Sequence, residues 1–505
     1  MVMLNRQANA IRSPFAIMRY ILVPCKTPDD FMQIDAPKPD EPGSSNAPSF
    51  CFFIAIGSLA FVLATYMFCP RFVMWTGFDL PATHYYPELN RAVSTLRQLE
   101  DPFTKSEVVS NAVIEWRLLF PIIGHYLHLP APVYFAIPHL GCLLVLTVMA
   151  SIVWQATRDR MIVLLATCIV ATASWLFISV GWLSYFDSWC LFGVIVVTFF
   201  RRWTALVLAC LLTPWVDERF ILTLPLCMVV RAVHMGQMDN NDIKSFIKTC
   251  GICFVAIIPY LAIRLVALTR GNDEAAMSYF GLINLTVGFD RWIKGAWMGL
   301  RGAWVFVVML PWLIWRRDRQ VWGVFIVAVT VVTIVGSLVI TGDLSRSMSM
   351  MVPAVLIGIV LLFRQSPRFS RRLIAGVLAF NLLAPASHVL LYFDVPIYYL
   401  PLEISRYEKP PPEFRAEFYH QRGVAAAQKQ ETVEALAEFS TAIRIDDKFV
   451  MAFYSRGVLL AAQGDYDGAL RDLNEAIRHA PPDWPHHQKA GEYLSRAQMK
   501  LTQPQ

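Results

Sequence analysis

The chain has 505 residues, of which 56% are hydrophobic and only 16% are charged, and its formal net charge is +6. Soluble globular proteins usually carry about 25% charged residues, so the composition excludes an ordinary soluble protein. The Lys and Arg residues gather in short loops between apolar blocks, where they set membrane orientation, and so indicate no nucleic-acid partner. The ten cysteines run from Cys25 to Cys253, nearly all in apolar blocks, which excludes a disulfide framework.

The first segment, 1–50, is polar, with a Pro-, Asp- and Ser-rich stretch from Thr27 to Ser49. Such a composition buries too little apolar surface to fold, so we expect a partly disordered segment. No apolar stretch with a small-residue cleavage site precedes Cys51, so no cleavable signal peptide is expected.

The apolar blocks run from Cys51 to Phe393. A helix needs about 20 apolar residues to cross the hydrocarbon core of a bilayer, and fewer where the bilayer thins. We therefore predict an all-α fold, with a polytopic transmembrane helix bundle of about eleven spans over 51–393. The predicted spans are 51–69, 132–154, 161–180, 185–200, 203–216, 219–233, 249–268, 297–315, 321–341, 351–363 and 373–393.

The region 204–230 could instead be one helix with Asp217, Glu218 and Arg219 at its centre. The basic residues favour two spans, because the loops on the cytoplasmic side then hold 14 Lys and Arg and the short loops on the other side hold 5. With one span, the arginine-rich loops after it would face outward and three charged residues would lie mid-membrane, which is costly.

This topology places the N-terminus in the cytoplasm and the polar features on the exoplasmic side of the plasma (inner) membrane. Those features are the loop 70–131, the turns at Asp187, Asp217 and Asp343, and the C-terminal region. The strongly polar residues near the membrane are thus all expected at one surface.

A repeat follows a predicted linker, 394–411. Gly423, Gly457 and Gly491 are spaced by 34 residues each time. This period, with small residues where paired helices approach closely, is the signature of the tetratricopeptide repeat (TPR). We predict a TPR α-solenoid over 412–505, with two repeats and a final capping helix. Such a domain usually binds a protein partner; the alternative is that it only covers the outer face of the membrane domain.

The outer loop 70–131 is the most informative segment, because it places Asp79 about ten residues beyond the first span. An amphipathic helix follows, with apolar residues from Leu89 to Leu99 recurring on one face. A second helix is expected before Pro121. Both apolar faces need burial, so we expect two helices that pack over the membrane domain.

A short cytoplasmic N-terminus, one span, a long helical outer loop and many further spans together resemble the GT-C superfamily of polyprenyl-phosphate-sugar-dependent glycosyltransferases. The resemblance covers roughly 51–393. Members of that superfamily use an acidic residue of the first outer loop in catalysis, at the place that Asp79 holds here. Leu80 stands where the usual second acid would be, and Glu88 is the candidate for that role. The C-terminal repeats are similar to those of O-mannosyltransferases that bear TPR domains.

The resemblance implies transfer of a sugar from a polyprenyl-phosphate carrier in the membrane lipid to an acceptor on the exoplasmic face. Asp79 is the candidate base for the acceptor hydroxyl. The leaving phosphate needs cationic partners, for which arginines at the outer ends of helices are candidates. A divalent metal ion is left open as a cofactor. The predicted substrate-binding residues are His84, Glu88, Asp217, Glu218, Arg219, Asp343 and Arg346, with Arg264 and Arg301 as further candidate arginines.

These residues also have purely structural interpretations. Asp217 could pair with Arg219 and Asp343 with Arg346 inside their own turns, while Arg264 and Arg301 could only reach toward the interface. The alternative function is a non-enzymatic membrane scaffold that recruits a partner through its TPR domain. An O-antigen-ligase-like or polymerase-like enzyme fits less well, because its large outer loop comes late in the chain. A transporter fits less well, because no pair of Gly- or Pro-broken helices recurs in two halves and the ionisable residues are expected at one surface. Convergence of the acidic turns on one site favours an enzyme, and scatter favours a scaffold.

Overall fold

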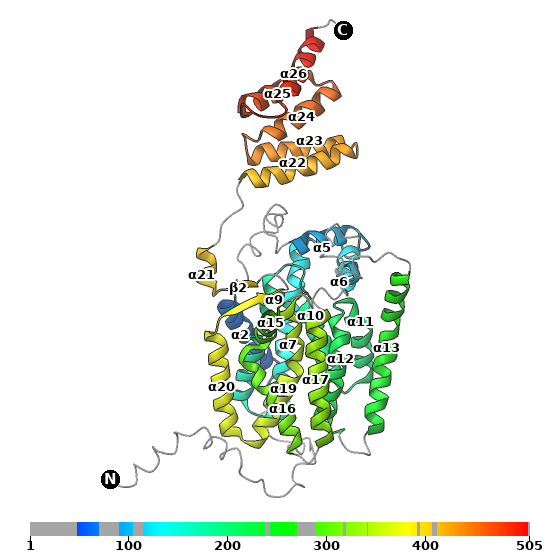
Figure 1. Cartoon of the computed structure of the whole chain (residues 1–505), viewed down its shortest axis with the longest axis vertical. Coiled ribbons are helices and arrows are strands. Elements are labelled where there is room, and N and C mark those ends of the chain that lie inside the picture. Colours follow the sequence, from blue (N-terminus) through cyan, green and yellow to red (C-terminus); the bar gives the residue numbers. More distant parts are fainter. Residues whose placement is uncertain are drawn as a thin grey trace, which may run out of the picture.

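The computed structural model of the protein describes residues 48–69, 90–104, 115–237, 243–269, 288–316, 320–340, 342–390, 394–406 and 412–502. Almost all elements are helices, and the strands in these ranges form one two-stranded sheet. Figure 1 shows a bundle of roughly parallel helices and, beyond one end of it, a smaller stack of helices that ends at the C-terminus. The all-α prediction is therefore confirmed.

The helices of the bundle follow the apolar blocks of the sequence. In chain order they are α2 (Phe50–Met67), α5 (Asn90–Glu100), α6 (Leu119–Tyr126), α7 (Ala131–Thr157), α8 (Arg160–Ala171), α9 (Ser174–Gly181), α10 (Asp187–Phe199), α11 (Trp203–Leu212), α12 (Arg219–Met235), α13 (Ile243–Thr269), α15 (Phe289–Leu300), α16 (Trp304–Trp315), α17 (Gln320–Ile340), α18 (Leu344–Met348), α19 (Val352–Gln365) and α20 (Pro367–Leu383). The short 3-10 turns η4 (Thr213–Trp215), η6 (Arg301–Ala303) and η7 (Ser349–Met351) extend α11 and join α15 to α16 and α18 to α19.

Several of these helices can span a membrane. Within the described ranges, six are long and apolar enough, and α8 with α9, bent by 58°, makes a seventh if the pair is one span. Each predicted span overlaps at least one helix, but α10, α11, α12 and α20 are short, with 10 to 17 residues. A multi-span bundle is thus confirmed, and the count of eleven spans stays a prediction.

The predicted span 373–393 ends earlier than expected. Pro385 disfavours helical backbone at the residue before it, so α20 ends at Leu383. The chain then forms strand β1 (Ala386–Val389), which pairs antiparallel with β2 (Asp394–Ile397). The start of the predicted linker 394–411 is therefore attached to the membrane domain, and the short helix α21 (Leu400–Ser405) follows it.

The described helices of the loop 70–131 lie over one end of the bundle, where Figure 1 shows α5 running across the tops of the long helices beside α6. Leu99 and Gly124 hold α5 and α6 together, because a Cβ on Gly124 would stand 2.4 Å from Leu99. The most buried residues of α5 are Ala92, Thr95 and Gln98, so two polar side chains share its inner face. The second predicted helix of this loop falls mainly on 105–114, outside the described residues.

The C-terminal stack consists of α22 (Pro412–Gln428), α23 (Thr432–Ile445), α24 (Val450–Gln463), α25 (Tyr466–His479) and α26 (His487–Thr502). The glycines of the 34-residue period explain this pairing. A Cβ on Gly423 would stand 2.5 Å from Phe439, and one on Gly457 would stand 3.0 Å from Leu473, both on the second helix of the pair. Gly491 meets no atom within 4 Å, because no described helix follows α26 to pair with it as α23 pairs with α22 and α25 with α24.

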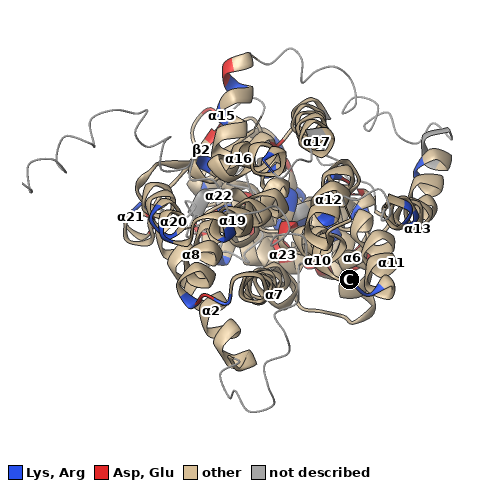
Figure 2. Ribbon diagram, turned by 90° about the horizontal axis from the view of Figure 1, so that it is seen from below, with Lys and Arg blue, Asp and Glu red and all other residues tan. Residues whose placement is uncertain are grey.

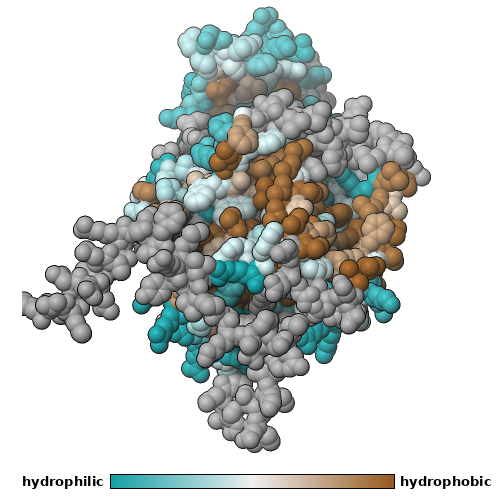
Figure 3. Space-filling view, turned by 60° about the horizontal axis from the view of Figure 1, so that its bottom comes forward, coloured by the Kyte–Doolittle hydropathy of each residue, from teal (hydrophilic) through white to brown (hydrophobic). Residues whose placement is uncertain are grey.

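Charge and hydropathy separate the two regions. Figure 2 shows the bundle helices almost entirely uncharged, apart from charged segments at the helix ends and inside the bundle near α10 and α12. In Figure 3 much of the described side of the bundle is hydrophobic, while the distant C-terminal stack is mostly hydrophilic. Large apolar side chains such as Phe254, Val308 and Val332 are more than half exposed, as expected of a surface that faces lipid.

Candidate functional site

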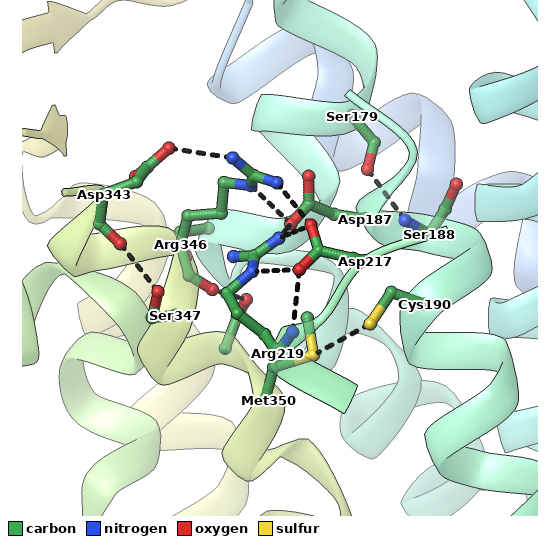
Figure 4. A network of polar contacts seen from close by, with 12 residues as sticks. Ser179, Asp187, Ser188, Cys190, Asp217, Arg219, Asp343, Arg346, Ser347 and Met350 are labelled. Carbon is green, nitrogen blue, oxygen red and sulfur yellow. Dashed lines mark hydrogen bonds and ion pairs between the residues drawn. The ribbon is translucent and has the colours of Figure 1, made fainter. Parts of the chain in front are cut away.

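Three acidic turns converge at the end of the bundle that α5 covers. Asp187 is the first residue of α10, Asp217 precedes α12, and Asp343 precedes α18. Arg219 and Arg346, one helical turn or less beyond two of these aspartates, point back into the same space (Figure 4). Carboxylates and guanidinium groups from three separate parts of the chain therefore form one cluster.

Each arginine of the cluster bridges separate turns. Arg219 donates through Nη2 to Asp187 Oδ1 at 2.5 Å and to Asp217 Oδ2 at 2.7 Å, and through Nε to Asp217 Oδ1 at 2.7 Å. Arg346 donates through Nε to Asp187 Oδ1 at 2.6 Å, through Nη2 to Asp217 Oδ2 at 2.8 Å and through Nη1 to Asp343 Oδ2 at 3.2 Å. The pairing predicted inside each turn occurs, and bonds between turns add to it.

The cluster continues into the outer loop. Arg117, just before α6, forms an ion pair with Asp217 at 3.0 Å and donates to both oxygens of Glu218. Burial alone would raise the pKa of Asp217, but Arg117 and Arg219 hold that pKa well below its ordinary value. Asp217 is therefore a carboxylate at neutral pH.

On its other side the cluster reaches the sheet. His388 on β1 lies 2.8 Å, through Nε2, from Asp343 Oδ1, and its ring stands edge-on to Trp182 and Tyr185. Burial would raise the pKa of Asp343, but His388 and Arg346 lower it below its ordinary value. The predicted span that placed His388 in lipid missed this contact.

One cation at the cluster has no carboxylate partner among the residues that the structure describes. The guanidinium of Arg91, on α5, lies 4.1 Å from the centre of the Tyr185 ring, and that of Arg346 lies 4.5 Å from the same ring. The Nε of Arg91 is buried without a hydrogen-bond partner in the described part of the chain. Burial and the nearby Arg117 and Arg346 lower the pKa of Arg91 to about 10, so it remains charged at neutral pH.

Of the predicted site residues, five meet in this cluster: Asp217, Glu218, Arg219, Asp343 and Arg346. The candidate base Asp79 and the predicted substrate-binding residues His84 and Glu88 lie outside the described residues.

The two further candidate arginines lie elsewhere. Arg264 stacks on Trp116 with 4.2 Å between the guanidinium and the ring centre. Arg301 is fully buried and donates to the carbonyls of Thr172, at 2.5 Å, and Ala384, at 3.2 Å. Thr172 stands at the bend between α8 and α9, so Arg301 satisfies a carbonyl that the broken helix leaves free.

Sequence patterns did not single out Arg91, Arg117 or His388. His388 lay inside a predicted span, and an ionisable residue inside a span usually has a partner. This was the one signal in the sequence that could have indicated its contact. No group of three or more His, Cys, Asp or Glu side chains in the described ranges is arranged to hold a metal ion.

Comparison with known proteins identifies only the C-terminal region. Residues 450–483, which cover α24, α25 and the turn that follows, match the tetratricopeptide repeat family. No curated protein and no solved structure matches the chain. The match confirms a TPR repeat at 450–483, and TPR repeats commonly bind protein partners. The extent of the predicted TPR domain over 412–505 stays a prediction.

Proposed function

We propose that the protein is a glycosyltransferase of the plasma (inner) membrane that moves a sugar from a polyprenyl-phosphate carrier to an acceptor on the exoplasmic face. The observation that carries the proposal is the convergence of the acidic turns at Asp187, Asp217 and Asp343 under α5. Polar side chains gathered at one end of an apolar bundle are typical of a site that handles a substrate at the membrane surface. The proposal includes about eleven spans, a cytoplasmic N-terminus and an exoplasmic TPR domain.

The base belongs to the outer loop in this proposal. Asp79 takes the proton of the acceptor hydroxyl as its oxygen attacks the sugar carbon, and the phosphate of the carrier leaves. His84 and Glu88, in the same loop, bind the sugar or the acceptor. The fixed ionic cluster beneath α5 supports this loop through Arg117, so the reacting groups need little reorganisation.

The donor phosphate needs net positive charge. Arg219 and Arg346 are almost fully buried, and Asp187, Asp217 and Asp343 offset their charges. Arg91 brings a further cation without a described carboxylate partner and is partly exposed. We therefore assign the first contact with the phosphate to Arg91, while Arg219 and Arg346 act behind it.

The TPR domain gives the second candidate function. Figure 1 shows its helices beyond the same end of the bundle as α5, so a protein held there would be close to the cluster. Such a protein is the acceptor or its carrier if the chain is an enzyme. A scaffold would need the TPR surface but not the charged cluster.

The experiment compares the protein with Asp79→Asn. The substitution keeps the side-chain shape and removes its basicity, so release of polyprenyl phosphate from a polyprenyl-phosphate sugar should fall at least 100-fold, the low end for a lost general base. Donor binding and thermal stability should stay unchanged. Full activity in Asp79→Asn would move the role to Glu88. No release by the protein itself with any such donor would favour the scaffold.

A further inference from the structure

A second feature lies at the opposite end of the bundle from the ionic cluster. A groove of about 350 Å³ runs between α11 and α13, lined by Val207, Lys248, Gly251, Ile252, Val255 and Ala256. The other four lining positions on α13 are three, four, seven and eight residues beyond Lys248, so all five share one face of the helix. The groove is apolar except for the one lysine.

The groove opens toward lipid. α13 stands at the edge of the bundle in Figure 1, and only 22% of its apolar, membrane-spanning stretch is buried inside the protein. A Cβ on Gly251 would meet no atom within 4 Å, so the helix surface is hollow at that position. Val255 is 63% exposed at the groove wall. The groove is therefore open apolar space that part of a lipid acyl chain can occupy.

The charged end of the groove faces away from the candidate site. α10 begins at Asp187, in the cluster, and ends at Phe199, so the following Arg201 and Arg202 lie at its far end. Trp203 then begins α11, and Lys248 Nζ lies 5.8 Å from the centre of its ring. Lys244 lies in the first turn of α13, four residues before Lys248, so four cations share one surface.

These four cations, Arg201, Arg202, Lys244 and Lys248, are all exposed. No acidic side chain in the described part of the chain forms an ion pair with any of them. An exposed tryptophan beside basic residues is typical of the level of the lipid headgroups, and lysine reaches toward that level from an apolar helix face. The surface offers positive charge directly above an apolar groove.

We infer that this groove binds one anionic phospholipid, with an acyl chain along Gly251 and Val255 and the phosphate at Lys248 and Lys244. The charge complementarity selects an anionic over a zwitterionic lipid, because each lysine near the surface attracts an anionic headgroup. The site is separate from the proposed transfer reaction, since Arg91 and the cluster lie at the other end of the bundle. Its occupant is a structural lipid of the inner leaflet, not the sugar donor.

The test uses the full chain, purified in detergent, with phosphatidylglycerol and phosphatidylcholine of the same acyl chains titrated and bound lipid counted by native mass spectrometry. We expect tighter binding of phosphatidylglycerol. Lys244→Ala with Lys248→Ala should weaken it about 25-fold, about fivefold for each lysine, with little effect on phosphatidylcholine. Lys244→Arg with Lys248→Arg should restore it, which separates charge from folding.

Two further variants sharpen the outcome. Gly251→Leu places a side chain in the groove and should lower the binding of both lipids. Arg316→Ala is the control, because Arg316 also stacks on an interfacial tryptophan, Trp312 at 4.4 Å, but lies outside the groove. Three results would each overturn the inference. The first is equal affinity of the unaltered protein for the two lipids, and the second is a loss of binding in Arg316→Ala equal to that of the double lysine variant. The third is competition by inorganic phosphate as effective as that by phosphatidylglycerol.

Discussion

Asp187→Asn tests whether the buried cluster holds the bundle together. One oxygen of Asp187, Oδ1, accepts from both Arg219 and Arg346, and the other, Oδ2, has no hydrogen-bond partner among the described residues. An asparagine can place its side-chain oxygen where Oδ1 stands and its amide nitrogen where Oδ2 stands. The substitution therefore removes one negative charge and little else.

The expected cost follows from burial. Asp187 is fully buried, and Arg219 and Arg346 are 3% exposed, so water does not screen the unbalanced charge. Removing one partner of a buried ion pair costs about 3–5 kcal/mol. Because the two hydrogen bonds persist, we expect the lower end of that range, about 3 kcal/mol. The loss should change little between low and high salt, since buried charges are screened much less.

The measurement is unfolding of the purified protein in detergent by increasing SDS, followed by fluorescence. Asp159→Asn is the matched control. It also loses an ion pair, to the half-exposed Arg371, while an asparagine still accepts from Ile162 N as the N-cap of α8. Its cost should stay below about 1 kcal/mol. If the two variants lose the same stability, or Asp187→Asn loses none, the cluster does not carry the stability assigned to it.

Three further predictions concern charge, packing and orientation. Because folding lowers the pKa of Asp217, Asp217→Asn should lose its full amount of stability above about pH 4. The loss should shrink as the pH falls through the folded-state pKa of Asp217, and a loss that grows in acid would contradict the assignment. The second prediction uses circular-dichroism melts of a 412–505 fragment. Gly423→Ala should lower the free energy of unfolding by about 1–3 kcal/mol through overpacking, while Gly491→Ala should raise it by about 0.5–1 kcal/mol. The reverse order would contradict the pairing of the helices. A reporter active only in the cytoplasm, fused after Gln505, should stay silent, and a strong signal would mean that the span count is off by one.

The helices and the repeat were predictable because both depend on the spacing of residues that are close together in the sequence. Apolar blocks long enough for a bilayer gave the positions of the bundle helices, and the glycines 34 residues apart gave the paired helices of the TPR domain. The boundary at Leu383 was missed, because 384–393 is as apolar as a span and only Pro385 marks the end of the helix. The pairing of β1 with β2 depends on contacts that local spacing does not encode.

The site was predictable in part. Loop charge predicted that Asp217, Arg219, Asp343 and Arg346 share one surface, but not that both arginines contact Asp187. That contact depends on the packing of α10, α12 and α18, which join residues more than 100 positions apart. Arg91 was hidden for a related reason. Its helix was interpreted from its apolar residues, whereas the buried inner face also carries Thr95 and Gln98.

The proposed function is tested most directly by donor binding. Affinities of the purified protein for a polyprenyl-phosphate sugar and for the phosphate-free polyprenol are compared with those of Arg91→Gln and of Arg97→Gln, a control on another face of α5. We predict binding that requires the phosphate and weakens at least tenfold in Arg91→Gln, as for a lost charge-assisted hydrogen bond, and not in the control. Equal binding of the phosphate-free lipid, or no binding of either, would contradict the glycosyltransferase.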